Sequence, residues 1–393
     1  MTTLRLRRRE ERRLLAGHLW VFSNEIDVRA TPLKGLEPGE PVRLESADGR
    51  FLAHAYANPA SLIAARVTSR DARAPFDEAM LRARLEAALA LRARRFDAPF
   101  YRWVHGEGDL LPGLVVDRYD DRLVAQITTA GMERRRETLV GLLAELSGAS
   151  SVTLANEAAV RELEGLPRLR EQALGETPDA LVVRERDLEF SVPAALTQKT
   201  GWFYDQRASR GALGRWTEGA RVLELYGYVG AFGLAAAAGG ARETLSIDAS
   251  APAVEAANEN ARRNGFGDVF EARAGDAVET MRALVESGER FDVVVLDPPA
   301  FVKRKRDRDA GLRHYALNNR LAMRLLAPGG VLLSASCSQT VDEAALNAVL
   351  RRALPKGAAG LQLLEPLSQD VDHPVHAAMP ETRYLSGAIA RVL

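Results

Sequence analysis

From about residue 186 onward, short apolar runs alternate with helix-patterned segments, and this alternation restricts the C-terminal half to an α/β architecture. Five runs have the length and composition of buried strands: 221–226, 243–248, 269–274, 291–297 and 330–336. Helices are expected between them, including 251–264 and 312–326. This order is typical of a mostly parallel sheet covered by helices on both faces. Ligands of such a sheet bind at the carboxyl ends of its strands.

The first 185 residues are patterned differently. Residues 1 to about 72 show short alternating stretches separated by turns such as Ala47-Asp48-Gly49-Arg50, which indicates a small β-domain. A helical pattern covers 75–96, and strand-like runs mix with a further helix between about 100 and 185. We therefore predict three domains: a small β-domain at 1–72, an α+β domain at 73–185 and an α/β domain at 186–393.

The charge balance limits how the chain can bind a polyanion. It has 53 basic and 53 acidic residues, so a nucleic-acid partner has to be met by local patches. Two arginine-rich segments qualify, and a solvated charged face is the ordinary alternative for either one. They comprise Arg5, Arg7, Arg8, Arg9, Arg12 and Arg13 in the first segment, and Lys303, Arg304, Lys305, Arg306 and Arg308 in the second.

Other bulk properties indicate where the chain works. No apolar run approaches the roughly 20 residues that a membrane span needs, and no apolar signal segment follows the basic N-terminus. A single cysteine is typical of a reducing compartment. We expect a cytoplasmic protein without a membrane partner.

A glycine turn after the first α/β strand predicts a cofactor site. Gly227 and Gly230 follow an acidic strand end and precede a helix, so the backbone there can approach a ligand closely. The segment does not match the G-x-G-x-x-G pattern of dinucleotide-binding loops. It fits better with a nucleoside that carries no pyrophosphate, such as S-adenosylmethionine.

Acidic residues close the next three strands. Asp248 is placed to accept hydrogen bonds from both ribose hydroxyls, Asp276 to meet the adenine amino group, and Asp297 ends the fourth strand. Helix capping explains each carboxylate singly. Their strand-by-strand order at one sheet edge favours the cofactor site.

Asp297 opens an Asp297-Pro298-Pro299-Ala300-Phe301 loop. The prolines stiffen this loop and remove backbone donors, which fixes its carboxylate and carbonyls around a planar group. Phe301 is suited to stack on a base or to pack structurally. Comparable loops serve enzymes that methylate amines, so this segment does not by itself choose the acceptor atom.

Cys337 directs the prediction to a pyrimidine carbon. It follows the fifth strand, which should lie beside the fourth, so we expect Cys337 and Asp297 to be neighbours. Cytosine C5 becomes nucleophilic when a thiolate adds to C6 and a carboxyl group near N3 stabilises the enamine. A nitrogen acceptor needs no thiol. The alternative is a semi-buried structural cysteine.

With these residues in hand, the chain resembles the bacterial large-subunit ribosomal RNA methyltransferase I family over nearly its whole length. The segments that carry the resemblance are 12–22, 156–166, 198–207, 372–374 and 380–385. The resemblance implies an N-terminal PUA-like RNA-binding β-barrel, an α+β middle domain and a C-terminal Rossmann-like class I methyltransferase domain.

The resemblance also implies site residues. Cys337 is expected to be the nucleophile and Asp297 to assist at the base. Cofactor contacts are expected from Lys199, Thr200, Phe203, Tyr226, Gly227, Gly230, Asp248, Asp276 and Asp297, with no metal. RNA contacts are expected from Arg7, Arg8, Arg9, Arg12, Arg13, Lys303, Arg304, Lys305 and Arg306.

The leading prediction is transfer of a methyl group from S-adenosylmethionine to C5 of a cytosine in 23S ribosomal RNA. A homodimer is suggested by the resemblance alone. Two alternatives stay open: methylation of an exocyclic base amine, and a non-catalytic RNA-binding or assembly factor. Because the chain has one cysteine, proton removal from C5 needs another base or water.

Overall fold

A computed structural model describes residues 1–196, 200–302 and 304–393. By its internal contacts the chain forms two compact units. Unit 1 comprises Met1–Asp179 with residues 200–202 and Val371–Thr382, and unit 2 comprises Ala180–Leu196, Phe203–Asp370 and Arg383–Leu393. The three-domain division at residues 72 and 185 stays a prediction.

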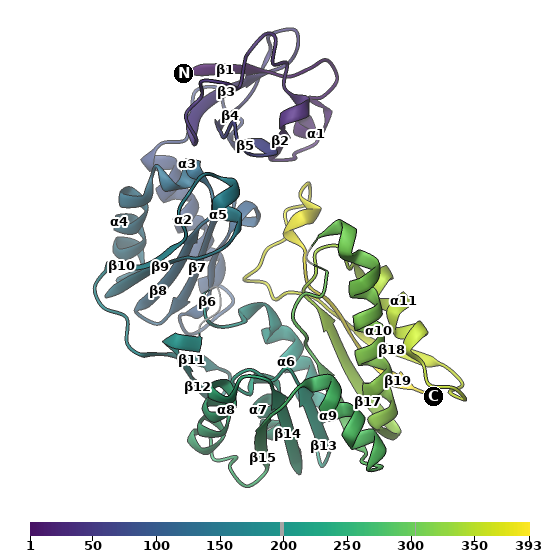
Figure 1. The fold of residues 1–393 in the computed structure, drawn as a ribbon. Coiled ribbons are helices and arrows are strands. Elements are labelled where there is room, and N and C mark those ends of the chain that lie inside the picture. Colours follow the sequence, from purple (N-terminus) through teal and green to yellow (C-terminus); the bar gives the residue numbers. More distant parts are fainter. Residues whose placement is uncertain (197–199, 303) are drawn as a thin grey trace. The chain divides into compact units, whose positions relative to one another are not determined.

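Unit 1 contains two five-stranded sheets (Figure 1). The first has the order β1-β3-β4-β5-β2, and its core is built from buried aliphatic residues such as Leu4, Val21 and Leu44. The strands of this sheet and the helix between the first two are β1 (Thr2–Arg5), α1 (Arg12–Leu15), β2 (Trp20–Phe22), β3 (Glu40–Glu45), β4 (Phe51–Ala57) and β5 (Ile63–Ser69).

The second sheet of unit 1 has the order β10-β9-β8-β7-β6. Residues of α2 and α4 share its core with Trp103, whose indole nitrogen donates a hydrogen bond to the carbonyl oxygen of Leu85 at 3.0 Å. The elements are α2 (Glu78–Ala93), β6 (Phe100–His105), β7 (Leu114–Tyr119), β8 (Arg122–Ile127), α3 (Ala130–Glu133), α4 (Arg136–Ser147), β9 (Ser151–Asn156), α5 (Val160–Leu163) and β10 (Leu169–Leu174).

Unit 2 is built on a seven-stranded sheet with the order β15-β14-β13-β16-β17-β19-β18. The strands from β15 to β17 are parallel, and β19 is antiparallel to both of its neighbours. The strands are β13 (Arg221–Leu225), β14 (Glu243–Asp248), β15 (Phe270–Ala274), β16 (Phe291–Leu296), β17 (Leu326–Ser336), β18 (Leu361–Leu367) and β19 (Ser386–Val392).

Alternate residues of each central strand face two different cores. Leu223 and Val294 point into a core shared with α9, α10 and α11, whereas Val222 and Val293 point into one shared with α6 and α7. Burial on both faces explains the continuous apolar runs in the sequence. The helices are α6 (Arg207–Leu213), α7 (Ala231–Ala238), α8 (Ala251–Arg263), α9 (Ala277–Glu286), α10 (Arg308–Leu325) and α11 (Glu343–Ala353).

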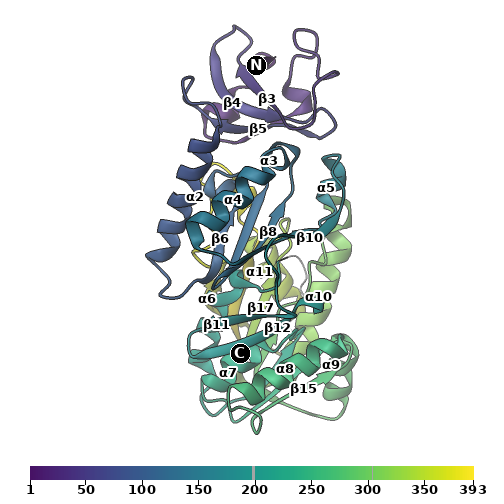
Figure 2. The ribbon, with the colours of Figure 1, turned by 90° about the vertical axis from the view of Figure 1, so that its left-hand side faces the viewer.

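A two-stranded hairpin, β11 (Ala180–Glu185) and β12 (Leu188–Pro193), lies against α8 (Figure 2). The amide of Ser191 donates to the side-chain oxygen of Asn260 at 2.8 Å. Among the residues described, no helix has both the length and the apolar character that crossing a bilayer requires.

The predicted α/β architecture of the C-terminal half is confirmed, with small corrections. The fourth and fifth predicted strands are parallel neighbours, β16 and β17. The first ends at Leu225 rather than at residue 226, and α10 begins at Arg308, four residues before its predicted start. The antiparallel pair β18 and β19 was not predicted.

Candidate active site

The loop between β13 and α7 is held in an unusual backbone conformation. Tyr226 and Tyr228 have φ angles of 65° and 50°, although neither is glycine, and Gly230 has a φ of 84°. Non-glycine residues in this region carry strain that is common at ligand-binding turns. A Cβ atom on Gly230 would lie 2.9 Å from the ring of Phe270. Glycine is therefore required at residue 230.

A buried glutamate at the end of β13 forms hydrogen bonds with α7, which follows this loop, and with β14. Glu224 Oε1 accepts a hydrogen bond from the amide of Phe232 at 3.0 Å, and Oε2 accepts one from Ser246 Oγ at 2.6 Å. Burial raises the pKa of Glu224 to about 7, against the opposing effect of these donors. Glu224 thus connects the start of α7 to β14.

Asp248 and Asp276 both support backbone turns at the sheet edge. The two carboxylate oxygens of Asp248 accept hydrogen bonds from the amides of Tyr228 and Ser250, each at 2.9 Å. Asp276 caps α9 by accepting from the amides of Val278 and Glu279. Asp276 is therefore a helix N-cap in this structure, which is the alternative role that the sequence analysis gave for it. A carboxylate oxygen has further acceptor capacity, so the ribose and adenine contacts remain predictions.

Tyr226 connects the loop to α10 and to the Asp-Pro-Pro loop. Its hydroxyl donates to Asn318 Oδ1 at 2.7 Å, and its ring centroid lies 6.4 Å from that of Phe301. Burial and the nearby Asp276 carboxylate raise the pKa of Tyr226 to about 12. Asn318 lies on α10, and no motif in the sequence identified it as a candidate site residue.

The Asp-Pro-Pro loop and Cys337 meet at the end of the β16–β17 pair. Leu296 is in register with Ser334, so Asp297 and Cys337 both follow the same parallel pair. The thiol of Cys337 donates to the carbonyl oxygen of Pro298 over 3.9 Å. Cys337 is half-buried. The expected proximity of Cys337 to this loop is therefore present in the structure.

Phe301 packs within the protein. Its ring centroid lies 4.8 Å from that of Tyr315 and 5.7 Å from that of His314. The hydroxyl of Tyr315 lies 3.0 Å from Ser338 Oγ, which also accepts from the amide of Val302 at 3.3 Å. These contacts fix the loop after the prolines against the segment after Cys337, which favours the structural role for Phe301.

Gln206, which the sequence analysis missed, binds the Asp-Pro-Pro carboxylate. Its Nε2 donates to Asp297 Oδ1 at 2.7 Å. The guanidinium of Arg210 on α6 is buried, which opposes its charge, but Glu185 and the carboxylates of Asp205 and Asp297 raise its pKa above the ordinary value. Arg210 therefore lies close enough to Asp297 for their charges to interact.

Three predicted cofactor residues precede α6. Thr200 belongs to unit 1, where its carbonyl accepts from the hydroxyl of Tyr119 at 2.8 Å and its hydroxyl accepts from Arg102 at 3.2 Å. Phe203 belongs to unit 2, and its ring packs edge-on against Tyr228 with centroids 5.6 Å apart. Lys199 lies outside the described residues.

The predicted RNA-binding arginines of the first segment differ in exposure. Arg7, Arg8, Arg9 and Arg12 are exposed. Arg13 is half-buried, since it forms an ion pair with Glu25 at 2.9 Å and stacks over Phe22. Arg13 is therefore tied into the small β-domain.

In the second arginine-rich segment, Arg304 and Arg306 are exposed, and Arg306 lies 3.8 Å from Asp307. Lys303 and the side chain of Lys305 lie outside the described residues.

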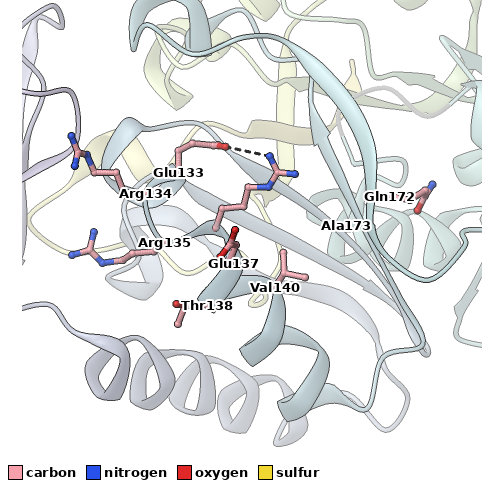
Figure 3. Close-up of a pocket in the computed structure, with 9 residues that line it drawn as sticks. Glu133, Arg134, Arg135, Glu137, Thr138, Val140, Gln172 and Ala173 are labelled. Atoms are coloured by element: carbon pink, nitrogen blue, oxygen red, sulfur yellow. Dashed lines mark ion pairs between the residues drawn. The ribbon is translucent and has the colours of Figure 1, made fainter.

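A hollow of about 900 Å³ lies on unit 1, near the start of α4 (Figure 3). Its three consecutive arginines already have partners. Arg134 pairs with Glu37 at 3.7 Å, Arg136 pairs with Glu133 at 3.7 Å, and Arg135 donates to two backbone carbonyls. We assign no anion site there.

Two known protein families match parts of the chain. Residues 4–70 match the PUA-like domain family, and residues 139–378 match the S-adenosylmethionine-dependent methyltransferase family. A crystal structure described as a methyltransferase complexed with SAH aligns over 100% of both chains, with a TM-score of 0.85 at 19% identity. This likeness concerns the fold.

Curated relatives match the entire chain. Ribosomal RNA large subunit methyltransferase I of Tolumonas auensis is 36% identical over 400 residues, covering 100% of both chains. The protein of the same name from Aeromonas salmonicida is 37% identical over 388 residues, covering 97% of both. The chain therefore belongs to the ribosomal RNA large subunit methyltransferase I family, with a PUA-like domain followed by an S-adenosylmethionine-dependent methyltransferase domain of Rossmann-like fold.

Proposed function

We propose that this protein methylates C5 of a cytosine in large-subunit ribosomal RNA through a covalent bond between Cys337 and C6. The observation that carries the proposal is the position of Cys337, one residue past β17 and in contact with Pro298 of the Asp-Pro-Pro loop. The relatives named ribosomal RNA large subunit methyltransferase I support the substrate class. Such a substrate agrees with a cytoplasmic enzyme, and a homodimer remains a prediction.

The cofactor fits the residues present in unit 2. The loop from Tyr226 to Gly230 has three positive φ angles, a side chain at Gly230 would clash with the ring of Phe270, and Asp248 lies at the adjacent strand end. S-adenosylmethionine, when bound, supplies the electrophilic methyl group. The predicted residues of unit 2 that would hold it are Phe203, Tyr226, Gly227, Gly230, Asp248, Asp276 and Asp297.

The chemistry begins with the thiol. The deprotonated sulfur of Cys337 adds to C6, and the electron pair of the C5–C6 double bond moves towards N3, where a protonated carboxyl of Asp297 stabilises it. C5 would then form a bond to the methyl carbon while the bond from that carbon to the sulfonium sulfur breaks, which releases S-adenosylhomocysteine. Loss of the C5 proton to a base returns the electrons to the C5–C6 bond and expels the thiolate. A base has to leave its stack to reach such a site.

The direct test identifies the methylated atom. Ribosomal RNA is taken from a strain lacking the gene and from the complemented strain, and its nucleosides are compared by mass spectrometry. The proposal predicts one 5-methylcytosine that depends on the gene. A gene-dependent methyl group on an exocyclic amine would overturn it.

Amine methylation remains the second candidate because Asp-Pro-Pro loops also serve that chemistry. Cys337→Ala separates the two. A covalent mechanism predicts a loss of methyl transfer of about a thousandfold or more, since the nucleophile is removed. An amine methyltransferase would retain its rate. A non-catalytic assembly factor would bind RNA and incorporate no labelled methyl group.

A further inference from the structure

The amide of Gln206 is oriented by its contact with Asp297. Gln206 lies just before α6, its side chain is only 2% exposed, and its Nε2 donates to Asp297 Oδ1 at 2.7 Å. Asp297 Oδ1 accepts this bond whether the carboxyl is ionised or carries its proton on Oδ2, and only the nitrogen of a glutamine amide donates hydrogen bonds. The nitrogen of Gln206 must therefore face Asp297, and its oxygen must face another direction.

That oxygen is an unused acceptor. Gln206 Oε1 is buried, and within the described part of the chain it has no hydrogen-bond partner. A buried acceptor without a partner costs stability, so such groups are rare and call for an explanation. A ligand that brings a hydrogen-bond donor would satisfy it.

The segment around Gln206 is held firmly. Asp205 Oδ2 accepts a hydrogen bond from the hydroxyl of Tyr384 at 2.5 Å, and the Asp205 carbonyl accepts from the amide of Asp370 at 3.0 Å. Arg210 on α6 forms a buried ion pair with Glu185 and donates to the carbonyl of Phe203 at 3.1 Å. Gln206 is thus fixed from both sides.

We propose that Gln206 Oε1 accepts a hydrogen bond from the exocyclic N4 amine of the target cytosine, which makes Gln206 a specificity residue. This inference rests on the proposed function, in which Asp297 lies at N3. N3 and N4 are adjacent on the same edge of the base, and Gln206 and Asp297 are bonded to each other. The two side chains together would read that edge.

The same arrangement would reject uracil. Uracil presents an oxygen where cytosine presents the N4 amine, and a proton on N3 where cytosine presents an acceptor. Gln206 Oε1 would then face another acceptor. A site built to hydrogen-bond one group discriminates strongly against an analogue that leaves its buried polar atoms unpaired.

The test compares two substrates and two enzymes. Synthetic fragments of large-subunit ribosomal RNA carry, at the mapped target position, either cytosine or 2-pyrimidinone, which lacks the amine. Single-turnover methylation is measured for the wild type and for Gln206→Met, which keeps the volume of the side chain. The ratio of the two rates within each enzyme cancels general losses of folding or activity.

We expect the ratio of the cytosine rate to the pyrimidinone rate to be about tenfold or more lower in Gln206→Met than in the wild type. A change of this size corresponds to the loss of one specific hydrogen bond to a base edge. Tyr384→Phe disturbs the neighbouring Asp205 without touching Gln206, and should slow both substrates equally. An unchanged ratio in Gln206→Met would overturn the inference.

Two further outcomes keep the test decisive. Gln206→Glu retains an acceptor oxygen, and a proton shared between its carboxyl and that of Asp297 replaces the hydrogen bond of the amide nitrogen. The variant should therefore keep the preference for the amine even if it reacts more slowly, and loss of the preference would also overturn the inference. A methyl group found on an atom other than C5 of the target would instead overturn the proposed function.

Discussion

The thiol of Cys337 lies 3.9 Å from the carbonyl oxygen of Pro298, the residue that follows Asp297. This contact joins the ends of two parallel strands, β16 and β17, whose register sets Leu296 opposite Ser334. In the proposed mechanism these strand ends supply the thiol and the carboxyl group that pyrimidine C5 chemistry uses.

Gly230→Ala should weaken cofactor binding. The substitution places a Cβ 2.9 Å from the ring of Phe270 at a φ of 84°, so it adds steric displacement to backbone strain. We expect a loss of about 1–3 kcal/mol in unfolding free energy and a measurable rise in the Kd for S-adenosylmethionine. Calorimetric titration and thermal unfolding measure the two effects.

Gly265→Ala is the matched control for this variant. Gly265 has a φ of 77°, but a Cβ there would meet no atom within 4 Å. It should share the backbone strain and leave cofactor affinity unchanged. Equal affinity in the two variants would contradict a role for the Gly230 turn in binding.

Glu224→Gln should change how stability depends on pH. Burial raises the pKa of Glu224 from 4.5 to about 7, so between these values the folded state binds more protons than the unfolded state. Stability contributed by the protonated form is therefore lost as pH rises from about 4.5 through 7. Gln removes this loss, and the variant should gain on the order of 3 kcal/mol relative to wild type between pH 5 and pH 8. Parallel stability curves from urea unfolding would contradict this.

Glu185→Gln should destabilise unit 2. Its carboxylate lies 2.6 Å and 2.5 Å from two nitrogens of Arg210, and both side chains are buried. Removing one partner of a buried pair costs about 3–5 kcal/mol, because the other charge loses the group that chiefly compensates it. Denaturant unfolding measures the loss. The exposed pair of Arg262 and Glu259 is the control, and Glu259→Gln should cost less than about 1 kcal/mol.

We predict that unit 1 is sensitive to acid because of two neighbouring histidines, His105 and His373. The rings of His105 and His373 lie 5.0 Å apart, and burial, followed by repulsion from His373, holds the pKa of His105 well below 6.5. The unfolded chain therefore binds a proton first, so stability present above pH 6.5 is lost as pH falls below it. The Tm should drop between pH 7.5 and 5.5.

His105→Asn should reduce this drop, because it removes a group that the unfolded state protonates preferentially. His314→Asn is the control, since His314 is exposed and should leave the pH profile unchanged. A drop of the same size in all three proteins would assign the acid sensitivity to other groups.

The sequence was sufficient to predict the parallel sheet and the pairing of its fourth and fifth predicted strands. Runs such as Phe291-Asp292-Val293-Val294-Val295 are apolar at successive positions because both faces of β16 are covered. Strand order then brings Cys337 to the Asp-Pro-Pro loop.

The contacts that complete the site depend on tertiary packing and leave no local pattern. Gln206 reaches Asp297 across 91 positions, and Tyr226 reaches Asn318 across 92. Thr200 is bound by Tyr119 and Arg102 of unit 1, although its motif continues into unit 2. A loop's own residues do not indicate which core it packs against.

Trapping the covalent bond between Cys337 and C6 tests the proposed mechanism most directly. RNA containing 5-fluorocytosine is incubated with the enzyme and S-adenosylmethionine, and any adduct that survives denaturation is digested and analysed by mass spectrometry. Fluorine at C5 cannot leave as a proton does, so the thiolate should stay bonded to C6. We predict an RNA adduct on the peptide containing Cys337, and none with Cys337→Ala. An enzyme that methylates unmodified RNA but forms no such adduct would contradict the account.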